Sequence, residues 1–159
     1  MSLPKLCTRR AGDHRGAELI EFAMVLPILL LVFAGIVDFA LMFQRYLVVA
    51  NAAREGARMA SMPGYTGADV TARVTTYVRQ GTGDTTVTPT ITSCRASVAV
   101  ATGPVVSAAR VVVITTYTFP VLGPVSNWVT GGTFGTINVG ARSTMRLEAG
   151  SGLAACTTP

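Results

Sequence analysis

The side chains that most often carry catalysis are scarce in this sequence. It has a single histidine, His14, and three cysteines, of which Cys94 and Cys156 are too far apart to form a Cys-x-x-Cys pair. The glycine-rich segment 131–135 lacks the Gly-Lys-Ser/Thr of a phosphate-binding loop, and we interpret it as a hairpin turn. We therefore expect no enzyme activity, no metal site and no cofactor.

Carboxylates stand out instead, because two of them open a long apolar segment. Glu18 and Glu21 lie just before a block, residues 22–43, that is apolar apart from a proline, a glycine and Asp38. As a helix this block would be about 33 Å long, which matches a hydrocarbon core of about 30 Å. Taken alone, the two glutamates favour the positive end of a helix dipole. The sequence thus predicts one membrane-spanning helix with acidic residues at its N-terminal end.

The segment ahead of the block is polar and basic. Four basic side chains and one acidic side chain precede Gly16, which favours a cytoplasmic N-terminus and an outer location for the rest of the chain. A cleaved secretory signal is the first alternative, but its apolar region would be about 7 to 15 residues long and would end at a small-x-small site, which is absent here. The net charge of +5 comes mostly from this segment, and no basic stripe with aromatic residues follows it, so we expect no nucleic-acid partner.

Asp38 lies inside the apolar block, where an ionised carboxylate costs about 2.5 to 3.5 kcal/mol on insertion scales. Such a residue usually has a partner. One interpretation gives it a basic group of another subunit or of a partner protein. In the other, Asp38 reaches for headgroups and water, about two turns from the outer boundary. Arg45 shares its face, but about 10 Å along the axis is too far for a direct ion pair.

The helical pattern continues past the block to residue 61, and Pro63 and Gly64 then end it. Inside the block, Pro27 removes one backbone hydrogen bond, so we expect a kink or a melted turn there. Small residues recur on one face of the continuing helix, and such a stripe lets helices approach closely. The stripe consists of Ala50, Ala53, Ala57 and Ala60.

Three charged residues accompany this stripe. In one interpretation Arg54, Glu55 and Arg58 form a solvated helical face with an i,i+3 pair between the glutamate and the second arginine. In the other, the alanines and these residues make a docking surface for another helix, and the arginines fix its register.

Beyond this helix the sequence predicts a small α+β domain, residues 62–148, and a tail, residues 149–159, that is flexible unless Cys156 anchors it. Valines at helical spacing indicate a helix over residues 69–80, and alternating apolar and polar residues indicate an antiparallel strand over residues 137–148. Weaker β-rich runs cover residues 98–101 and 110–119.

Two cysteines would lie outside the membrane, in an oxidising space. A bridge between Cys94 and Cys156 would close about 60 residues and would contribute about 4 kcal/mol in the chain-entropy model. Two unpaired cysteines remain the alternative.

The residues around Gly16 resemble a known processing site. Gly16-Ala17-Glu18-Leu19-Ile20-Glu21-Phe22 resembles the prepilin-peptidase site of the tight-adherence (Flp) pilins, a glycine followed by four residues and Glu-Tyr or Glu-Phe. Together with residues 17–27, 38–40 and 51–58, the site resembles the TadE-like minor pilins of that system, over about residues 9–61. Phe22 departs from the tyrosine common in the major pilins, and the larger outer domain also departs from a main filament subunit.

This resemblance implies a pilin-like α+β protein made with a leader, residues 1–16, which prepilin peptidase removes between Gly16 and Ala17. The long helix would then run over residues 17–61. The implied location is the bacterial inner membrane, crossed once, with possible incorporation in a surface pilus. The implied partners are prepilin peptidase, other pilins or pseudopilins, an inner-membrane assembly platform and membrane lipid.

Cleavage would free an ammonium on Ala17, about one helical turn from Glu21. In a stack of subunits, Glu21 of one chain can pair with the ammonium of its neighbour and set the registry, and Glu18 is an alternative for that role. The implied function is assembly of a tight-adherence pilus by helix association. The alternative is an uncleaved single-pass envelope anchor whose outer domain scaffolds a pilus or secretion complex.

Overall fold

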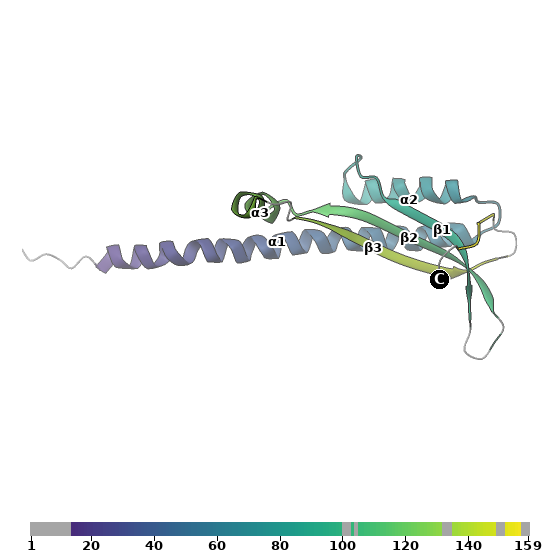
Figure 1. Cartoon of the computed structure of the whole chain (residues 1–159), viewed down its shortest axis with the longest axis horizontal. Helices are drawn as coiled ribbons and strands as arrows, with labels where there is room; N and C mark the ends of the chain where they lie inside the picture. Colours follow the sequence, from purple (N-terminus) through teal and green to yellow (C-terminus); the bar gives the residue numbers. More distant parts are fainter. Residues whose placement is uncertain (1–13, 100–102, 104, 132–134, 149–151, 157–159) are drawn as a thin grey trace, which may run out of the picture.

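The structure is a computed structural model that describes residues 14–99, 103, 105–131, 135–148 and 152–156. Most of the predicted leader and part of the predicted tail lie outside the described residues. In chain order the elements are α1 (His14–Ser61), α2 (Gly67–Thr82), β1 (Thr90–Val98), β2 (Val106–Thr118), α3 (Leu122–Thr130) and β3 (Thr136–Arg146). The predicted α+β arrangement is confirmed, and Figure 1 shows α1 as a rod with α2 and the sheet along its C-terminal half and α3 beside the stretch before it.

The rod is a continuous helix, which corrects the expectation of a melted turn at Pro27. Pro27 lies inside α1 without interrupting the helix (Figure 1). Proline removes one hydrogen bond, and the neighbouring turns, rich in leucine and alanine, are strong helix formers that tolerate this loss. The helix also begins at His14 rather than Ala17, so Glu18 does not lie in its first turn. The first-turn dipole interpretation therefore does not hold for the intact chain.

The three strands form one antiparallel sheet in the order β1-β2-β3. In the central strand β2 alternate residues are buried, among them Val111 and Val113, and Val113 is paired with Ile91 on one side and Ala141 on the other. The alternation predicted for the last strand is present in β3, where Val139 is buried and Arg142 is exposed. The run predicted at residues 98–101 marks only the end of β1, which lies mostly earlier in the chain.

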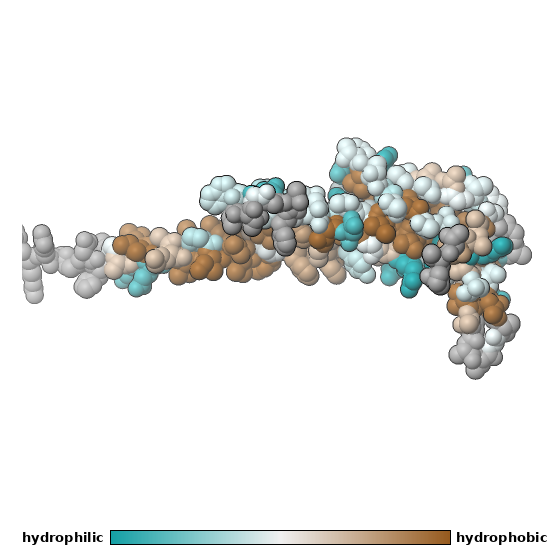
Figure 2. All heavy atoms as spheres, in the orientation of Figure 1, coloured by the Kyte–Doolittle hydropathy of each residue, from teal (hydrophilic) through white to brown (hydrophobic). Residues whose placement is uncertain are grey.

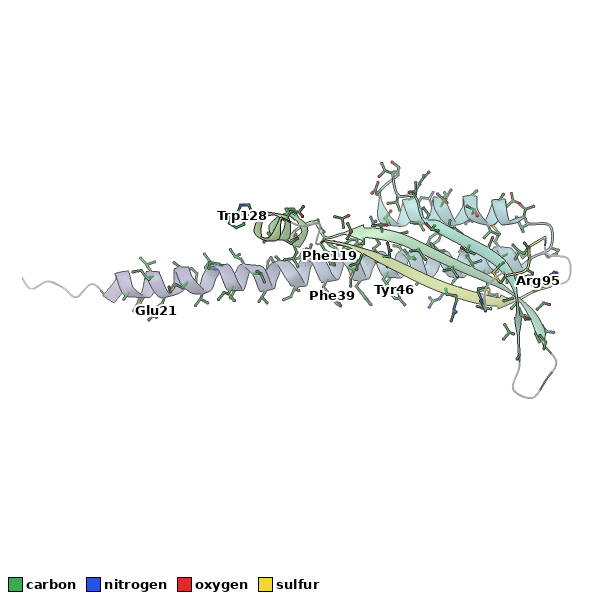
Figure 3. All side chains as sticks on the ribbon, viewed as in Figure 1. Glu21, Phe39, Tyr46, Arg95, Phe119 and Trp128 are labelled. Atoms are coloured by element: carbon green, nitrogen blue, oxygen red, sulfur yellow. A yellow bond between two sulfur atoms is a disulfide. The ribbon has the colours of Figure 1, made fainter. Side chains whose placement is uncertain are left out.

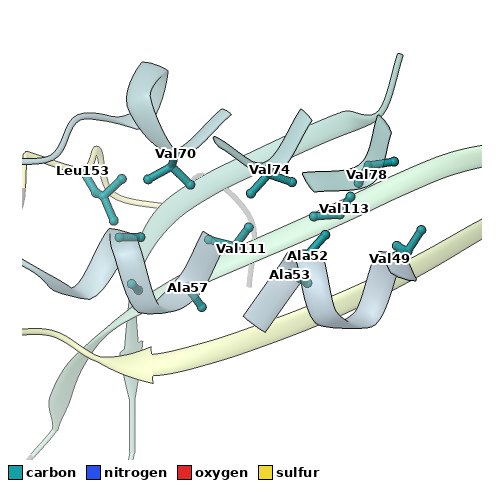
Figure 4. Close-up of a cluster of buried hydrophobic side chains, with 12 residues drawn as sticks. Val49, Ala52, Ala53, Ala57, Val70, Val74, Val78, Val111, Val113 and Leu153 are labelled. Atoms are coloured by element: carbon teal, nitrogen blue, oxygen red, sulfur yellow. The ribbon is translucent and has the colours of Figure 1, made fainter. Parts of the chain in front are cut away.

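The core lies between the inner face of the sheet, the C-terminal half of α1 and α2 (Figure 4). The predicted second helix is confirmed as α2, and Val70, Val74 and Val78 are fully buried. Thr66 and Asp69 form a capping box at its start, in which each side chain bonds the other residue's backbone N–H. This cap fixes where α2 begins and therefore which valines face the core.

Two glycines permit α1 and α2 to pack closely. A Cβ atom added to Gly56 would lie 2.6 Å from Val74 Cγ2 and 3.2 Å from Val111 Cγ1. A Cβ atom on Gly81 of α2 would lie 2.6 Å from Val48 Cγ1. These distances are shorter than a carbon–carbon contact allows, so both positions require glycine for the helices to keep this separation.

A disulfide fixes the C-terminal segment against β1. Cys94 and Cys156 are bonded, with their Cα atoms 5.0 Å apart and a sequence separation of 62. Arg95 N donates to Ala154 O at 2.7 Å, and Cys156 N donates to Arg95 O at 3.0 Å. Leu153 is buried in the core next to this crossing. Residues 152–156 are thus part of the folded domain, because Cys156 anchors this stretch of the predicted tail.

The connection between β2 and β3 contains a helix that the sequence analysis did not predict. Helix α3 lies beside α1, toward its N-terminal end from the sheet (Figure 1). Gly131 ends α3 in a left-handed conformation, with φ of 64°, and its N–H donates to Asn127 O. The glycine-rich segment predicted as a hairpin turn is therefore, at its start, the C-terminal cap of a helix; residues 132–134 of it lie outside the described part.

Candidate functional site: the apolar half of the long helix

The N-terminal half of α1 presents large apolar side chains that the rest of the chain leaves uncovered. Phe33, for example, keeps 63% of its surface exposed. Figure 2 shows this half of the rod as a nearly continuous hydrophobic surface. The exposed set is Leu19, Ile20, Phe22, Met24, Val25, Ile28, Leu29, Leu30, Leu31, Val32, Phe33, Ile36 and Phe39. The helix is long and apolar enough to cross a membrane, in agreement with the predicted span.

Glu18 and Glu21 lie near the free end of this surface. Both side chains are exposed, and Figure 3 shows Glu21 projecting from the rod. Neither has a hydrogen bond or ion pair with another described residue of the chain. Because they are three residues apart, they lie on neighbouring positions of one helix face. The arrangement is an apolar rod with two available carboxylates at one end.

Asp38 has its partner within the chain, an arrangement that neither sequence interpretation included. Its side chain is 1% exposed. Oδ2 accepts from Leu122 N at 2.7 Å, and Oδ1 accepts from Val121 N at 3.2 Å. The carboxyl of α1 thus caps the N-terminus of α3, where two backbone N–H groups lack partners inside their own helix. No sequence signal pointed to this contact, because the partners are backbone atoms more than eighty residues away.

A second group of contacts holds the sheet to α1 just beyond Asp38. Tyr117 Oη donates to Asp38 O at 3.4 Å, and the Arg45 guanidinium lies 5.6 Å from the centre of the Tyr117 ring. Arg45 also donates to Thr116 O at 3.5 Å. Burial raises the pKa of Tyr117, the Asp38 carboxylate raises it further, and Arg45 opposes this effect. As expected from their spacing, Asp38 and Arg45 make no direct ion pair among the described residues.

The predicted docking stripe is occupied by the chain's own domain. Ala53 and Ala57 are 0% exposed, Ala60 is also buried, and Ala50 is half-buried. Ala53, Ala57 and Ala60 belong to the core cluster with α2 and the sheet, and Figure 4 shows Ala53 and Ala57 there. Ala53 and Ala57 are therefore not accessible to another subunit's helix in this fold, whereas the docking interpretation of Ala50 stays a prediction. Small residues indicate close packing, and here the partners are α2 and the strands of the same chain.

Of the charged residues beside the stripe, Glu55 and Arg58 form a surface network with Arg73. Arg58 Nε and Nη2 each donate to Glu55 at 3.0 Å, and Arg73 of α2 adds a contact at 3.4 Å. Arg54 donates to Asn51 Oδ1 at 3.2 Å. Hydrogen bonding from Arg58 is the main cause that lowers the pKa of Glu55. The i,i+3 pair predicted from the sequence is present, and Arg73 is the member that helix spacing could not reveal.

The described residues contain no group of three or more histidine, cysteine, aspartate or glutamate side chains able to hold a metal ion. What the site offers is an apolar surface, two end carboxylates and a buried carboxyl that binds a second helix.

Comparison with known proteins gives one match. Residues 16–58 match the profile of the TadE-like protein family. This confirms the predicted resemblance over the N-terminal helix, including Gly16, both end glutamates and Asp38, and it is consistent with a TadE-like pilin of the Tad pilus system. No curated protein and no solved structure matches the chain.

Proposed function

We propose that this chain, TadE-like over residues 16–58, is a minor pilin or pseudopilin of a Tad pilus that is cut between Gly16 and Ala17 and assembles through its long helix. The observation that carries the proposal is the uncovered apolar half of α1 with carboxylates at its free end. A soluble domain rarely exposes so large a contiguous apolar surface, so this surface serves lipid first and other subunits afterwards.

The position of Gly16 suits a processing site. In the intact chain Gly16 and Ala17 lie within the first turns of α1. A peptidase binds its substrate in an extended form, so these turns must open before cleavage. Glycine has the weakest helix propensity after proline, by about 1 kcal/mol relative to alanine, and so lowers the cost of opening at this point. The cut itself adds water across the peptide bond and leaves a carboxylate on Gly16 and an ammonium on Ala17.

The new ammonium gives the mature helix a charged end that matches Glu21. Within one chain the two groups are about one turn apart, and the ammonium of a neighbouring chain can approach Glu21 from above in a stack. Inside a bundle of apolar helices the effective dielectric is low, so a unit-charge pair is much stronger than in water. Such a pair sets the axial register of neighbouring subunits. Glu18 lies close enough to pair with the same ammonium, in place of Glu21 or together with it.

The alanine face of the C-terminal half is not available for this role. Because Ala53, Ala57 and Ala60 are already buried beneath the domain, we assign packing between subunits to the half that includes Phe22 and Phe33. The partners we propose are prepilin peptidase, other pilins or pseudopilins, and an inner-membrane assembly platform. The location we propose is the inner membrane, with the α+β domain on its outer face.

Processing is tested by the mass of the protein recovered from its native membrane. Loss of residues 1–16 supports the proposal, and a full-length chain beginning at Met1 in cells with active prepilin peptidase supports an uncleaved anchor instead. Gly16→Val should abolish processing, because the peptidase pocket would meet a branched side chain. Gly12→Val, also in the leader, is the matched control and should be cut normally. Equal processing of both variants would contradict the assigned site.

Assembly is tested separately from processing by charge removal. Glu21→Gln should still be cut, but crosslinking to other pilus subunits and pilus formation should both fall sharply. Glu18→Gln shows whether the second carboxylate shares the role, and Glu148→Gln, two residues after β3, is a control with the same chemical change. Normal piliation in the Glu21→Gln and Glu18→Gln double variant would refute charge matching.

A further inference from the structure

Helix α3 lies against the apolar block of α1, which is an unusual position for a connection that is exposed to water. Leu122 and Val125 face α1 across an apolar groove of about 580 Å³ whose other wall includes Pro27, Leu31 and Val37. These α1 residues lie well inside the apolar block. Figure 3 places Trp128 of α3 alongside the stretch of α1 between Glu21 and Phe39. If α1 spans the bilayer, α3 lies at the depth of the lipid.

The N-terminus of α3 is built for surroundings without water. A helix leaves its first N–H groups without internal partners, and in lipid each unsatisfied group costs several kcal/mol. Here Val121 N and Leu122 N donate to Asp38, and Gly123 N donates to Phe119 O at 3.1 Å. The next residue is Pro124, which has no N–H. Every N–H group in this first turn is therefore bonded or absent.

The outer surface of α3 fits the boundary between headgroups and acyl chains. The helix contains no charged residue. Trp128 is 87% exposed, and Val121 and Val125 remain partly exposed. Tryptophan prefers the membrane–water interface, where its ring is in apolar surroundings and its N–H finds a polar partner. An interfacial helix enters about 5–10 Å into this boundary.

We propose that α3 is a second membrane-binding element, inserted in the leaflet on the side of the α+β domain and tied to α1 by Asp38. Its partner is bilayer lipid. The inference rests on α1 crossing the membrane and is independent of cleavage at Gly16. It explains why a carboxyl is retained in the apolar block: Asp38 satisfies the backbone of a helix that lies beside it. It also places the boundary of the bilayer on the domain side near Asp38 rather than at Phe43.

Trp128 is the only tryptophan in the chain, so its fluorescence reports on α3 alone. The full chain would be reconstituted in phosphatidylcholine–phosphatidylglycerol vesicles, with and without lipids brominated on their acyl chains. We expect blue-shifted emission, strong quenching by the brominated lipids and little quenching by aqueous iodide. Because the chain itself leaves Trp128 exposed, such shielding must come from outside it.

Two other results would overturn the proposal. Red-shifted emission that iodide quenches and brominated lipid does not would place α3 in water. Shielding from iodide without quenching by brominated lipid, lost when the protein is diluted with excess lipid, would mean that a second copy covers α3. Trp128→Phe gives the background signal for all measurements.

The role of Asp38 is tested in the same assay. In Asp38→Asn an amide N–H₂ replaces one acceptor and faces the backbone donors of α3, so we expect weaker quenching by brominated lipid and greater access of iodide. Asp84→Asn, in the turn just after the C-terminal end of α2, is the matched control and should behave as the wild type. Quenching unchanged in the Asp38→Asn variant would contradict its role as the tie, whereas the wild-type result tests insertion on its own.

Discussion

The two halves of α1 differ in side-chain size and in exposure, although one unbroken helix forms both. In the N-terminal half the side chains are large, and Phe33 is 63% exposed. In the C-terminal half they are small on one face, and Ala53 is 0% exposed. Helix periodicity is the same throughout, so the difference lies in side-chain size and in what each half meets.

The comparison shows how side-chain size separates internal from external contacts. Small residues let α2 and the sheet approach the axis of α1 closely, and the chain completes that packing by itself. Large apolar residues without an internal partner require lipid or another protein. Asp38 lies where the exposed half of α1 meets the buried half, and there it binds α3, which packs beside the apolar half. The following predictions test whether contacts within the α+β domain stabilise the C-terminal half of α1 and leave the apolar half unaffected.

The largest effect is expected from the disulfide. Replacing both Cys94 and Cys156 by serine should lower the free energy of unfolding of the domain by about 4 kcal/mol, because the bridge closes a loop of some sixty residues. Urea unfolding of the full chain in detergent, followed by circular dichroism, measures this change. The helical signal of the apolar half should persist through the transition. A reductant should shift the wild type in the same way and leave the variant unchanged; equal midpoints for both proteins would contradict the prediction.

Glycine substitutions compare the two halves directly. Gly56→Ala should destabilise the domain by roughly 1–3 kcal/mol through overpacking against Val74, which exceeds the gain of about 1 kcal/mol in helix propensity. Gly35→Ala in the apolar half meets nothing within 4 Å and should be neutral or slightly stabilising. Thermal unfolding of both variants in the same detergent provides the measurement. Equal losses for the two would show that the halves are not packed differently.

Removal of the α2 cap should have a smaller effect. Thr66→Ala deletes the hydroxyl that accepts from Asp69 N and should cost about 1 kcal/mol of unfolding free energy. Thr76→Ala, in the middle of the same helix, is the control and should be close to neutral. Amide hydrogen exchange should show faster exchange in α2 of the first variant and no change in the apolar half of α1. Uniform loosening of α1 would contradict this separation.

The smallest effect concerns pH. The folded pKa of Glu55 lies below its ordinary value of 4.5, so its pairing stabilises the domain above that pH and is lost as pH falls through the folded pKa. The pair lies at the surface, where solvent screens it, so the effect on stability is small. Glu55→Gln should flatten the acid limb of a stability-against-pH curve, and Glu148→Gln should not. An unchanged acid limb in the first variant would refute the assignment.

The sequence predicted the features that depend on local periodicity. The span of α1, the buried valines of α2 and the alternation in β3 all follow from spacings of three to four or of two residues. The features it missed depend on tertiary contacts. Helix α3 is short, and its glycine and proline hide the helical pattern. The capping of α3 by Asp38 joins residues more than eighty positions apart.

The candidate site was predicted in part for the same reason. The apolar block and its end glutamates are local, and the structure leaves them exposed as expected. The alanine stripe was predicted as a close-packing face, but its partner was misassigned. Small side chains determine how closely a neighbouring element packs, but only the complete fold shows that this neighbour is α2.

The continuity of α1 has a mechanical consequence. No flexible linker separates the apolar half from the half that forms the domain core, and Pro27 and Gly35 do not interrupt the helix. Tilt or rotation imposed on one end of α1 is therefore transmitted to the other end through the rigid helix. A pull directed outward on the α+β domain acts along the axis of the apolar half and draws it from its surroundings lengthwise, without first unfolding the protein.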